Sequence, residues 1–255
     1  MTTFTLQDRT AVISGASRGI GEAITWAYVR AGANVVVSSR REENIKPVAE
    51  AISREFPHRA VAVAAHAGKQ ESARLLVDAA VDNFGRLDIA VNNAATNPHF
   101  GPILTATESQ WDKILEVNVK GYYWLSQASA VQMRKQGDGG KIINIASVAG
   151  LEPSLMLGVY SVSKAAIIMF TKVLAMELGP DNIQVNGIAP GFVKTRFSQA
   201  LWGNESLNQA ILDRTPAGRM AEPDEIVGAA IYLASVASDF TTGTTLKIDG
   251  GYTLT

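Results

Sequence analysis

Tyr160 and Lys164 stand four residues apart in the run YSVSK, and a mainly apolar run follows them. If this segment is helical, both side chains emerge from one face, so that a phenol lies beside an ammonium group. A neighbouring positive charge favours the phenolate and lowers a pKa that is ordinarily about 10. Tyr160 is therefore a candidate proton donor or acceptor for a carbonyl or alcohol oxygen. A surface tyrosine and lysine spaced by chance would look the same, so the pair needs support from the rest of the chain.

A glycine-rich turn near the N-terminus has the residues that a phosphate site needs. The β-rich run of residues 10–14 leads into Gly15, Gly19 and Gly21 of GASRGIG, and a helical pattern follows. Glycine lets the backbone turn tightly and approach a pyrophosphate, and the N–H groups at the start of a helix attract the anion. The spacing is G-x-x-x-G-x-G and not G-x-G-x-x-G, so a plain strand-to-helix turn remains the alternative.

Short runs of Val, Ile and Ala alternate with helical patterns along the whole chain. The expected strands are 10–14, 33–39, 60–65, 87–95 together with its loop, 141–147, 182–190 and 244–251. The expected helices include 42–56, 70–84, 108–135, 160–178 and 223–235. This alternation is typical of βαβ units. It predicts an α/β fold, a Rossmann-like, doubly wound, seven-stranded parallel sheet with helices on both faces, in a single domain of residues 1–255.

In such a sheet, ligands bind beyond the carboxyl ends of the strands. Gly15, Ser39, Asn93, Ser147 and Gly191 all follow or end predicted strands. We therefore expect residues 1–140 to hold mainly a coenzyme. Residues 141–255 are expected to supply the catalytic groups, a substrate lid at about 191–216 and the C-terminal strand.

The composition excludes several other classes of protein. The 255 residues are 47% hydrophobic with a formal net charge of −1, which gives no footprint for nucleic acid or an anionic membrane. Cysteine is absent, and His58, His66 and His99 lack metal-like spacing, so we expect no metal. The N-terminus lacks a signal pattern, the ending TLT is no peroxisomal address, and no apolar run comes near the roughly 18 residues of a membrane span. A soluble cytoplasmic protein is expected.

Six features in order resemble the short-chain dehydrogenase/reductase family over essentially the whole chain. They are the glycine turn, Asn92-Asn93-Ala94, Asn118 in NVKG, Ser147, the pair Tyr160 and Lys164, and PGFVKT at 190–195. The resemblance implies that Tyr160 protonates the substrate oxygen during hydride transfer, while Ser147 hydrogen-bonds the same oxygen. It implies that Lys164 holds the nicotinamide ribose and lowers the pKa of the phenol, and that Asn118 anchors a water that passes protons to Lys164. For Asn118, a capping or packing role is the alternative.

The resemblance also implies a coenzyme site along the carboxyl edge of the sheet. Its residues would be Gly15, Ser17, Arg18, Gly19, Ile20, Gly21, Ser39, Arg40, His66, Asn93, Ala94, Tyr160, Lys164, Pro190, Gly191, Val193 and Thr195. The chain departs from the family pattern at Ser14, where Thr is usual, at Ala95, where Gly is usual, and at His66. His66 stands where an Asp commonly contacts adenine, so we expect its backbone or imidazole to do this work.

The residue that ends the second strand indicates which coenzyme is used. An acidic residue there binds a free ribose 2′-OH, but this chain has Ser39, followed by Arg40 and Arg41. Arg18 in the glycine turn faces the same region, and guanidinium groups bind phosphate in a bidentate manner. NADP(H) is therefore the expected cofactor, with solvated surface arginines as the alternative.

Several stretches are similar to the NADP-dependent carbonyl and retinal reductases of peroxisomal type, among them VVVSSR, HAGK, NAATNPHFG and APGFVKTRFSQALW. The expected reaction is NADPH-dependent reduction of a ketone or aldehyde carbonyl. The 3-oxoacyl-carrier-protein reductases and sugar or polyol dehydrogenases share the same motifs, and a cofactor-binding scaffold without turnover is the non-enzymatic alternative. An apolar pocket suits an apolar or aromatic carbonyl substrate, although the lid residues could instead pack on their own core. Its expected lining is Phe192, Phe197, Leu201, Trp202 and Leu207, with Phe100, Leu151 and Met156.

The helix that follows Tyr160 is apolar nearly all round, because only Thr171, Lys172 and Glu177 are clearly polar between residues 165 and 178. The preceding helix, with Tyr122, Tyr123, Trp124 and Leu125, can cover only part of it. An apolar surface left over on a monomer usually marks an interface. We therefore expect a homo-oligomer, and the resemblance favours a homotetramer.

Overall fold

A computed structural model describes residues 4–254 of the chain, which fold around one β-sheet. Within these residues it has seven strands in the order β3-β2-β1-β4-β5-β6-β7, and every neighbouring pair is parallel. The strands are β1 (Thr10–Ser14), β2 (Asn34–Ser39), β3 (Ala60–Ala64), β4 (Ile89–Asn92), β5 (Gly140–Ile145), β6 (Ile183–Pro190) and β7 (Thr245–Ile248). The predicted fold is confirmed, and the strand order reverses between β1 and β4. We also expected no signal segment at the N-terminus and no peroxisomal address at the C-terminus. These two expectations involve residues 1–3 and 255, which lie outside the described residues.

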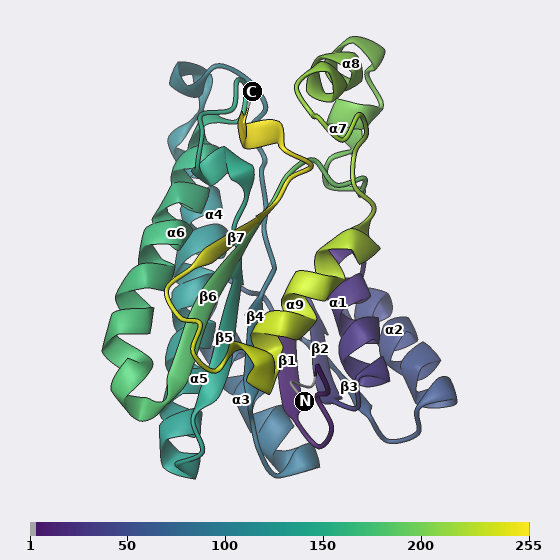
Figure 1. Cartoon of the computed structure of the whole chain (residues 1–255), viewed down its shortest axis with the longest axis vertical. Helices are drawn as coiled ribbons and strands as arrows, with labels where there is room; N and C mark the ends of the chain where they lie inside the picture. Colours follow the sequence, from purple (N-terminus) through teal and green to yellow (C-terminus); the bar gives the residue numbers. More distant parts are fainter. Residues whose placement is uncertain (1–3, 255) are drawn as a thin grey trace.

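Helices cover both faces of the sheet (Figure 1). One apolar core lies under α1 (Gly19–Arg30), α2 (Glu42–Glu55) and α9 (Val227–Ala234), and a second lies under α3 (Gln70–Phe84), α5 (Gly121–Gln136) and α6 (Gly158–Leu178). Neighbouring strand residues alternate between the cores: Val12 packs in the second and Ile13 in the first. Both faces of the five inner strands are thus largely buried, as expected for a parallel sheet, whereas the edge strands β3 and β7 are half-buried.

The remaining helices lie mostly around the carboxyl edge of the sheet. They are α4 (Glu108–Leu115), α7 (Gln199–Trp202) and α8 (Glu205–Asp213), with the shorter turns η1 (Ile103–Thr105), η3 (Val148–Gly150), η4 (Gly179–Asp181), η5 (Pro223–Ile226), η6 (Val236–Ser238) and η7 (Tyr252–Leu254). Figure 1 shows α7 and α8 projecting beyond the sheet on the same side as the C-terminus. The segment 191–216, the predicted lid, therefore contains short helices.

The single helix predicted over residues 108–135 was wrong, because a turn of π-helix, η2 (Glu116–Lys120), separates α4 from α5. Asn118 lies in this turn and is fully buried. Its side chain bonds the backbone of Thr96 in the loop after β4, which holds the widened turn in place. Such π-turns within helices often lie at functional sites.

A row of polar side chains crosses the middle of the buried sheet. Asn92 on β4 donates to Ser126 Oγ of α5 at 2.9 Å and to Asn144 Oδ1 of β5 at 2.8 Å. Asn144 in turn donates to Thr171 Oγ1 of α6 at 2.9 Å. The four side chains are almost completely buried, and each has a partner in the row, so that their burial leaves these bonds satisfied.

By length and composition alone, Gly158–Asp181 is long and apolar enough to cross a membrane, so the expectation that no run comes near a membrane span was wrong. Within the described residues, 44% of this segment is buried inside the protein. The segment is mainly α6, and it places Ser163, Lys164 and Thr171 against the sheet, where all three are buried. A core helix packed in this way meets the same criterion as a membrane span.

Candidate active site

The turn between β1 and α1 forms a cradle of backbone. Gly15 has a φ of 67°, and a Cβ there would lie 2.8 Å from Ala94 Cα, so a side chain is excluded by both conformation and space. A Cβ on Gly21 would collide with the Asn93 side chain and the Gly15 carbonyl. The first N–H groups of α1 donate to no capping side chain, because the residue before the helix is Arg18, whose guanidinium cannot accept a hydrogen bond. These free N–H groups at a helix start suit a phosphate.

Asn93 and Ser14 fasten the loop after β4 to this turn. Asn93 Nδ2 donates to the carbonyl oxygens of Ser14 at 3.0 Å and Gly15 at 2.9 Å. Ser14 Oγ accepts from the backbone N–H groups of Asn93 at 3.0 Å and Ala94 at 3.2 Å. Ser14, where Thr is usual, therefore keeps a hydroxyl that braces this loop. In this structure Asn93 shapes the cradle from behind.

The positive groups predicted to select the coenzyme follow β1 and β2, and His66 follows the neighbouring β3. Arg18 and Arg40 are exposed, and within residues 4–254 neither forms an ion pair, whereas Arg41 lies 3.6 Å from Glu43. Arg40 is close enough to His66 to help lower the pKa of that imidazole. Burial is the main cause of the lowered pKa of His66, and the Lys113 ammonium, 3.1 Å from His66 Nε2, comes next. The structure thus brings Arg40 and His66 together at one edge.

Asn118 has every hydrogen of its amide engaged. Its Oδ1 accepts from Thr96 N at 2.8 Å, and its Nδ2 donates to Thr96 O at 3.0 Å and to Ser163 Oγ at 3.1 Å. Ser163 stands beside Lys164 on α6, and its hydroxyl donates to the Tyr160 carbonyl at 2.7 Å. Asn118 therefore ties the loop after β4 to the helix of the Tyr/Lys pair. Its expected role in anchoring a water stays a prediction.

Ser147, Tyr160 and Lys164 come together where β5 meets α6. Ser147 follows β5, and its Oγ accepts from Ala149 N at 3.1 Å, which fixes the turn that holds it. The side chain of Ser147 also hydrogen-bonds Tyr160. Lys164 Nζ lies 5.7 Å from the centre of the Tyr160 ring. The helical spacing therefore places the phenol and the ammonium on one face, as predicted.

Burial controls the charge of these two groups. It raises the pKa of Tyr160 to about 12, although the hydrogen bond with Ser147 works in the other direction. It lowers the pKa of Lys164 to about 7, since the ammonium is removed from water. We expected Lys164 to lower the pKa of the Tyr160 phenol, and for the chain without coenzyme this expectation was wrong. Tyr160 is a protonated phenol at neutral pH, ready to donate.

The lid begins directly after β6. Gly191 lies against Asp249, since a Cβ there would be 2.8 Å from Asp249 Cα, and Val193 is buried and paired with Ala221. Thr195 lies beside the glycine turn, because its methyl group would be 3.2 Å from a Cβ on Gly19. The structure thus brings the segment 190–195 and the glycine turn to the same place.

The predicted pocket lining divides into two groups. Phe197 packs against Tyr160, with ring centres 5.7 Å apart and ring planes tilted by 43°. Phe192 instead packs edge-on against Tyr252 at 4.9 Å, and Trp202 donates its ring N–H to Thr195 O at 2.9 Å. Phe192 and Trp202 therefore support the lid from within, whereas Phe197 contacts the Tyr160 ring.

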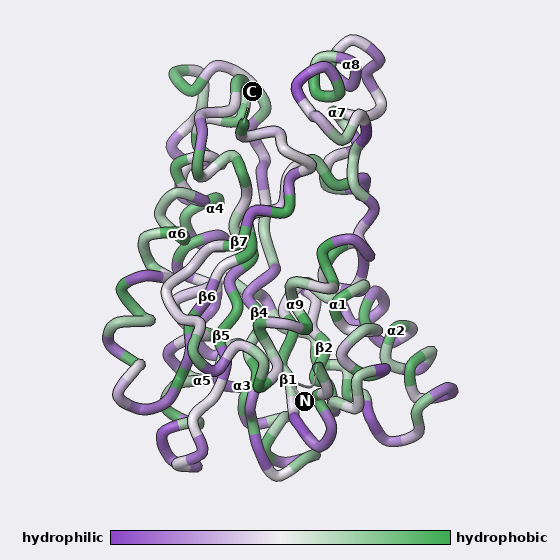
Figure 2. The backbone as a smooth tube through the Cα atoms, viewed as in Figure 1, coloured by the Kyte–Doolittle hydropathy of each residue, from purple (hydrophilic) through white to green (hydrophobic). Residues whose placement is uncertain are grey.

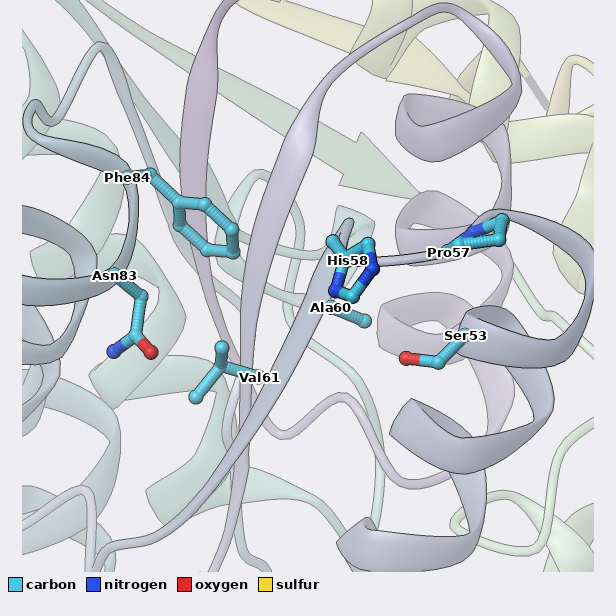
Figure 3. A pocket seen from close by; sticks show the side chains of 7 residues that line it. All are labelled: Ser53, Pro57, His58, Ala60, Val61, Asn83 and Phe84. Atoms are coloured by element: carbon cyan, nitrogen blue, oxygen red, sulfur yellow. The ribbon is translucent and has the colours of Figure 1, made fainter.

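A surface depression lies away from this site, at the opposite end of the edge strand β3. It has a volume of about 390 Å³ and is lined by Ser53, Pro57, His58, Ala60, Val61, Asn83 and Phe84 (Figure 3). None of these residues belongs to the glycine turn or to the Tyr/Lys pair. Within residues 4–254, no cluster of three or more metal-ligating side chains exists. The chemistry of the chain is therefore concentrated at the carboxyl edge.

The sequence did not predict the roles of two residues at this edge of the sheet. Tyr122 was predicted only as packing, yet its hydroxyl accepts from Lys164 Nζ at 3.1 Å. Ser198 Oγ donates to Val193 O at 2.6 Å and accepts from Thr195 N at 3.1 Å, which closes the start of the lid. Neither residue stands at a motif spacing, and their roles depend on contacts with distant segments.

Residues 15–253 match the sequence model of a family described as enoyl-(acyl carrier protein) reductase. This stretch contains the glycine cradle and the cluster of Ser147, Tyr160 and Lys164. The chain belongs to the short-chain dehydrogenase/reductase family. Its members exchange hydride between a nicotinamide coenzyme and a carbon that carries oxygen. The predicted family, fold and enzyme class are confirmed.

The relatives give this membership more detail. The chain is 38% identical over 246 residues to dehydrogenase/reductase SDR family member 4 of Oryctolagus cuniculus, covering 96% of this chain and 94% of that protein. It is 37% identical over 254 residues to 2-dehydro-3-deoxy-D-gluconate 5-dehydrogenase of Dickeya dadantii, covering 99% and 98%. Among solved structures, a gluconate 5-dehydrogenase from Burkholderia cenocepacia in complex with NADP and tartrate matches with a TM-score of 0.94 at 35% identity, covering 99% and 98%.

Proposed function

We propose that this chain is an NADPH-dependent carbonyl reductase in which Tyr160 donates the proton. The observation that carries the proposal is the cluster of half-buried Ser147 and Tyr160 with buried Lys164, next to a backbone cradle that only glycine permits. A hydride donor leaves negative charge on the carbonyl oxygen, and preplaced donors stabilise that charge as it develops. A binding scaffold without turnover would not need this arrangement.

The residues present fit a nicotinamide dinucleotide. The glycine turn and the start of α1 would hold its phosphates, and Arg18, Arg40 and His66 would lie at its adenosine end, with Ser17, Ile20, Ser39, Ala94 and Pro190 as further proposed contacts. When bound, the coenzyme supplies hydride to the substrate carbon. The chain supplies the rest: Ser147 orients the carbonyl oxygen, and Tyr160 gives it the proton held by a phenol whose pKa is raised to about 12. Lys164 supplies positive charge behind the phenol in its ammonium form.

The proposed preference for NADPH rests on Arg18 and Arg40. Arg40 follows β2, Arg18 lies in the turn after the neighbouring β1, and both are exposed. No acidic residue ends β2, and neither arginine forms an ion pair in the described part of the chain. Their guanidinium groups are therefore available to a 2′-phosphate. The Burkholderia relative was solved with NADP, which supports this choice.

Tyr160→Phe is the variant that tests the mechanism. It should leave coenzyme affinity nearly unchanged and lower kcat by a factor of roughly 100 to 10,000, since general acid catalysis is lost. Stopped-flow turnover and fluorescence titration of NADPH measure the two quantities. Wild-type turnover in the variant would refute the role of Tyr160, and a higher kcat/KM with NADH than with NADPH would refute the coenzyme assignment.

We propose an apolar or aromatic carbonyl substrate, because exposed apolar side chains lie on the loop after β4, on the loop before α6 and at Phe197, which contacts Tyr160. Leu104 and Leu155 are each 95% exposed, and Gly101 pairs with Leu157 directly before α6, which brings their two loops together. Figure 2 shows hydrophobic stretches in the loops near the C-terminus, at this end of the molecule. A patch of this kind on a soluble surface usually marks a binding site. Its residues are Phe100, Ile103, Leu104, Leu151, Leu155, Met156 and Phe197.

Oxidation of a sugar acid is the second candidate. It is favoured by the 37% identity to the Dickeya dehydrogenase over 99% of this chain. A panel of aryl ketones, diketones and quinones with NADPH, and of gluconate-type acids with NADP⁺, separates the two. Efficient oxidation of the acids without reduction of any ketone would overturn the apolar assignment.

We further propose that the active form is a homotetramer in the cytoplasm. Val162, Met169, Val173 and Met176 recur along one outward face of α6, and Met176 is 80% exposed. Tyr123 of α5 meets Phe170 of α6 with ring centres 6.5 Å apart, so the two helices share this surface. Two-fold packing of α5 and α6 against a second copy would bury it.

A further inference from the structure

Tyr122 is a buried phenol that the reaction described above does not use. It stands on α5, and its side chain is only 1% exposed. Its hydroxyl donates to the Ile145 carbonyl at 2.9 Å and accepts from Lys164 Nζ at 3.1 Å. Lys164 Nζ also donates to the same Ile145 carbonyl at 2.7 Å. The three polar atoms therefore form a closed triangle at the carboxyl end of β5, two residues before Ser147.

On the side of the sheet, the Lys164 ammonium faces the Tyr122 hydroxyl and the Ile145 carbonyl. Within residues 4–254, no carboxylate pairs with Lys164, and the titratable groups that face it are Tyr122 from α5 and Tyr160 from its own helix, with the Ile145 carbonyl from β5. Nζ lies 5.0 Å from the centre of the Tyr122 ring and 5.7 Å from that of Tyr160. The ammonium is thus held between two aromatic faces, which attract a cation.

We propose that Tyr122 is a positioning residue of the reaction, which anchors the Lys164 ammonium at the end of β5 and directs its remaining N–H toward the coenzyme side. An ammonium has three N–H groups. Two of them are taken by Tyr122 Oη and the Ile145 carbonyl, and one is left. The inference rests on the proposed roles of Tyr160 and Lys164.

The hydroxyl of Tyr122 also favours the charged form of Lys164. A buried ammonium is costly unless acceptors surround it, and burial already lowers the pKa of Lys164 to about 7. Tyr122 itself stays a neutral acceptor, because burial raises its pKa well above the ordinary value. Removal of Oη leaves the ammonium with one acceptor, so the pKa of Lys164 falls further.

Tyr122→Phe removes Oη and keeps the ring. Tyr28→Phe is the matched control, since Tyr28 is fully buried on α1 and its hydroxyl donates to the Ala230 carbonyl at 2.9 Å, with no lysine involved. We expect Tyr122→Phe to lower kcat roughly 10-fold, as for the loss of one hydrogen bond to a charged group. The alkaline limb of its kcat/KM profile should move to lower pH, because Lys164 loses its proton earlier. Tyr28→Phe should change neither.

A measurement without coenzyme completes the test. In protein labelled with ¹³C-lysine, the Cε signal of Lys164, identified by its loss in Lys164→Met, should titrate at lower pH in Tyr122→Phe than in the wild type. Tyr122→Met, which fills the space with a flexible side chain, repeats the comparison if the Phe variant does not fold. Equal Lys164 titrations and equal kcat in Tyr122→Phe and Tyr28→Phe would overturn the inference. If Tyr160→Phe keeps wild-type turnover, the proposed function fails instead.

Discussion

At the scale of single residues, the charge of Lys164 sets how the protein responds to pH. Its pKa is lowered to about 7 in the folded chain by burial, whereas an unfolded lysine titrates at about 10.4. Below pH 7 both states carry the proton, and the full cost of burying the charge is present. Between pH 7 and about 10.4 the unfolded state binds the extra proton, so the free energy of unfolding rises with pH.

Lys164→Met should abolish this rise. We expect the free energy of unfolding of the wild type, relative to the variant, to increase by about 1 kcal/mol per pH unit from pH 7.5 to 9.5, and to be flat between pH 5 and 6. Urea unfolding at these pH values measures the difference. The raised pKa of Tyr160 acts above pH 10 and is shared by both proteins, as is the lowered pKa of His66. Parallel stability curves would show that Lys164 does not titrate in this range.

At the scale of elements, the sequence was informative where a function depends on local order along the chain. Strand ends place Gly15, Asn93 and Ser147 at one edge, and the period of 3.6 places Tyr160 and Lys164 on one face. The π-turn at Asn118 was not predictable, because the loop after β4, distant in sequence, holds it open. The raised pKa of Tyr160 was missed for a related reason, since burial depends on the whole fold and not on the neighbour four residues away.

The glycine turn depends on its brace. Asn93→Ala removes both hydrogen bonds to the carbonyls of Ser14 and Gly15, so the cradle loses its support. We expect coenzyme affinity to fall about 10-fold and the free energy of unfolding to fall by about 1 to 2 kcal/mol. Isothermal titration with NADPH and urea unfolding measure these effects. Asn83→Ala is the control, because exposed Asn83 donates to the Ala79 carbonyl on α3, and unchanged affinity in both variants would contradict the bracing role.

At the scale of the whole molecule, the outward face of α6 separates a monomer from an assembly. Met169 and Val173 are 58% and 41% exposed and lie in the middle of this face. Glu at both positions would place charges in a desolvated interface, so we expect the double variant Met169→Glu, Val173→Glu to sediment as a smaller species than the wild type. Leu75→Glu, at a 50% exposed position on α3, should leave the sedimentation coefficient unchanged. A wild type that sediments as a monomer would refute the assembly.

The polar row of Ser126, Asn92, Asn144 and Thr171 has a consequence for how the chain finds one structure. Both faces of β4 and β5 are buried, so sliding one strand along the other by a residue would exchange apolar side chains for other apolar side chains. Hydrophobic burial discriminates weakly between such alignments. A slipped pairing would strand two asparagine amides in the interior without partners, at a cost of about 1 to 3 kcal/mol for each unsatisfied group. The row therefore fixes the register of β4 against β5, because it favours the pairing of Asn92 with Asn144 over slipped pairings. The same register sets where Asn93 and Ser147 emerge at the edge of the sheet.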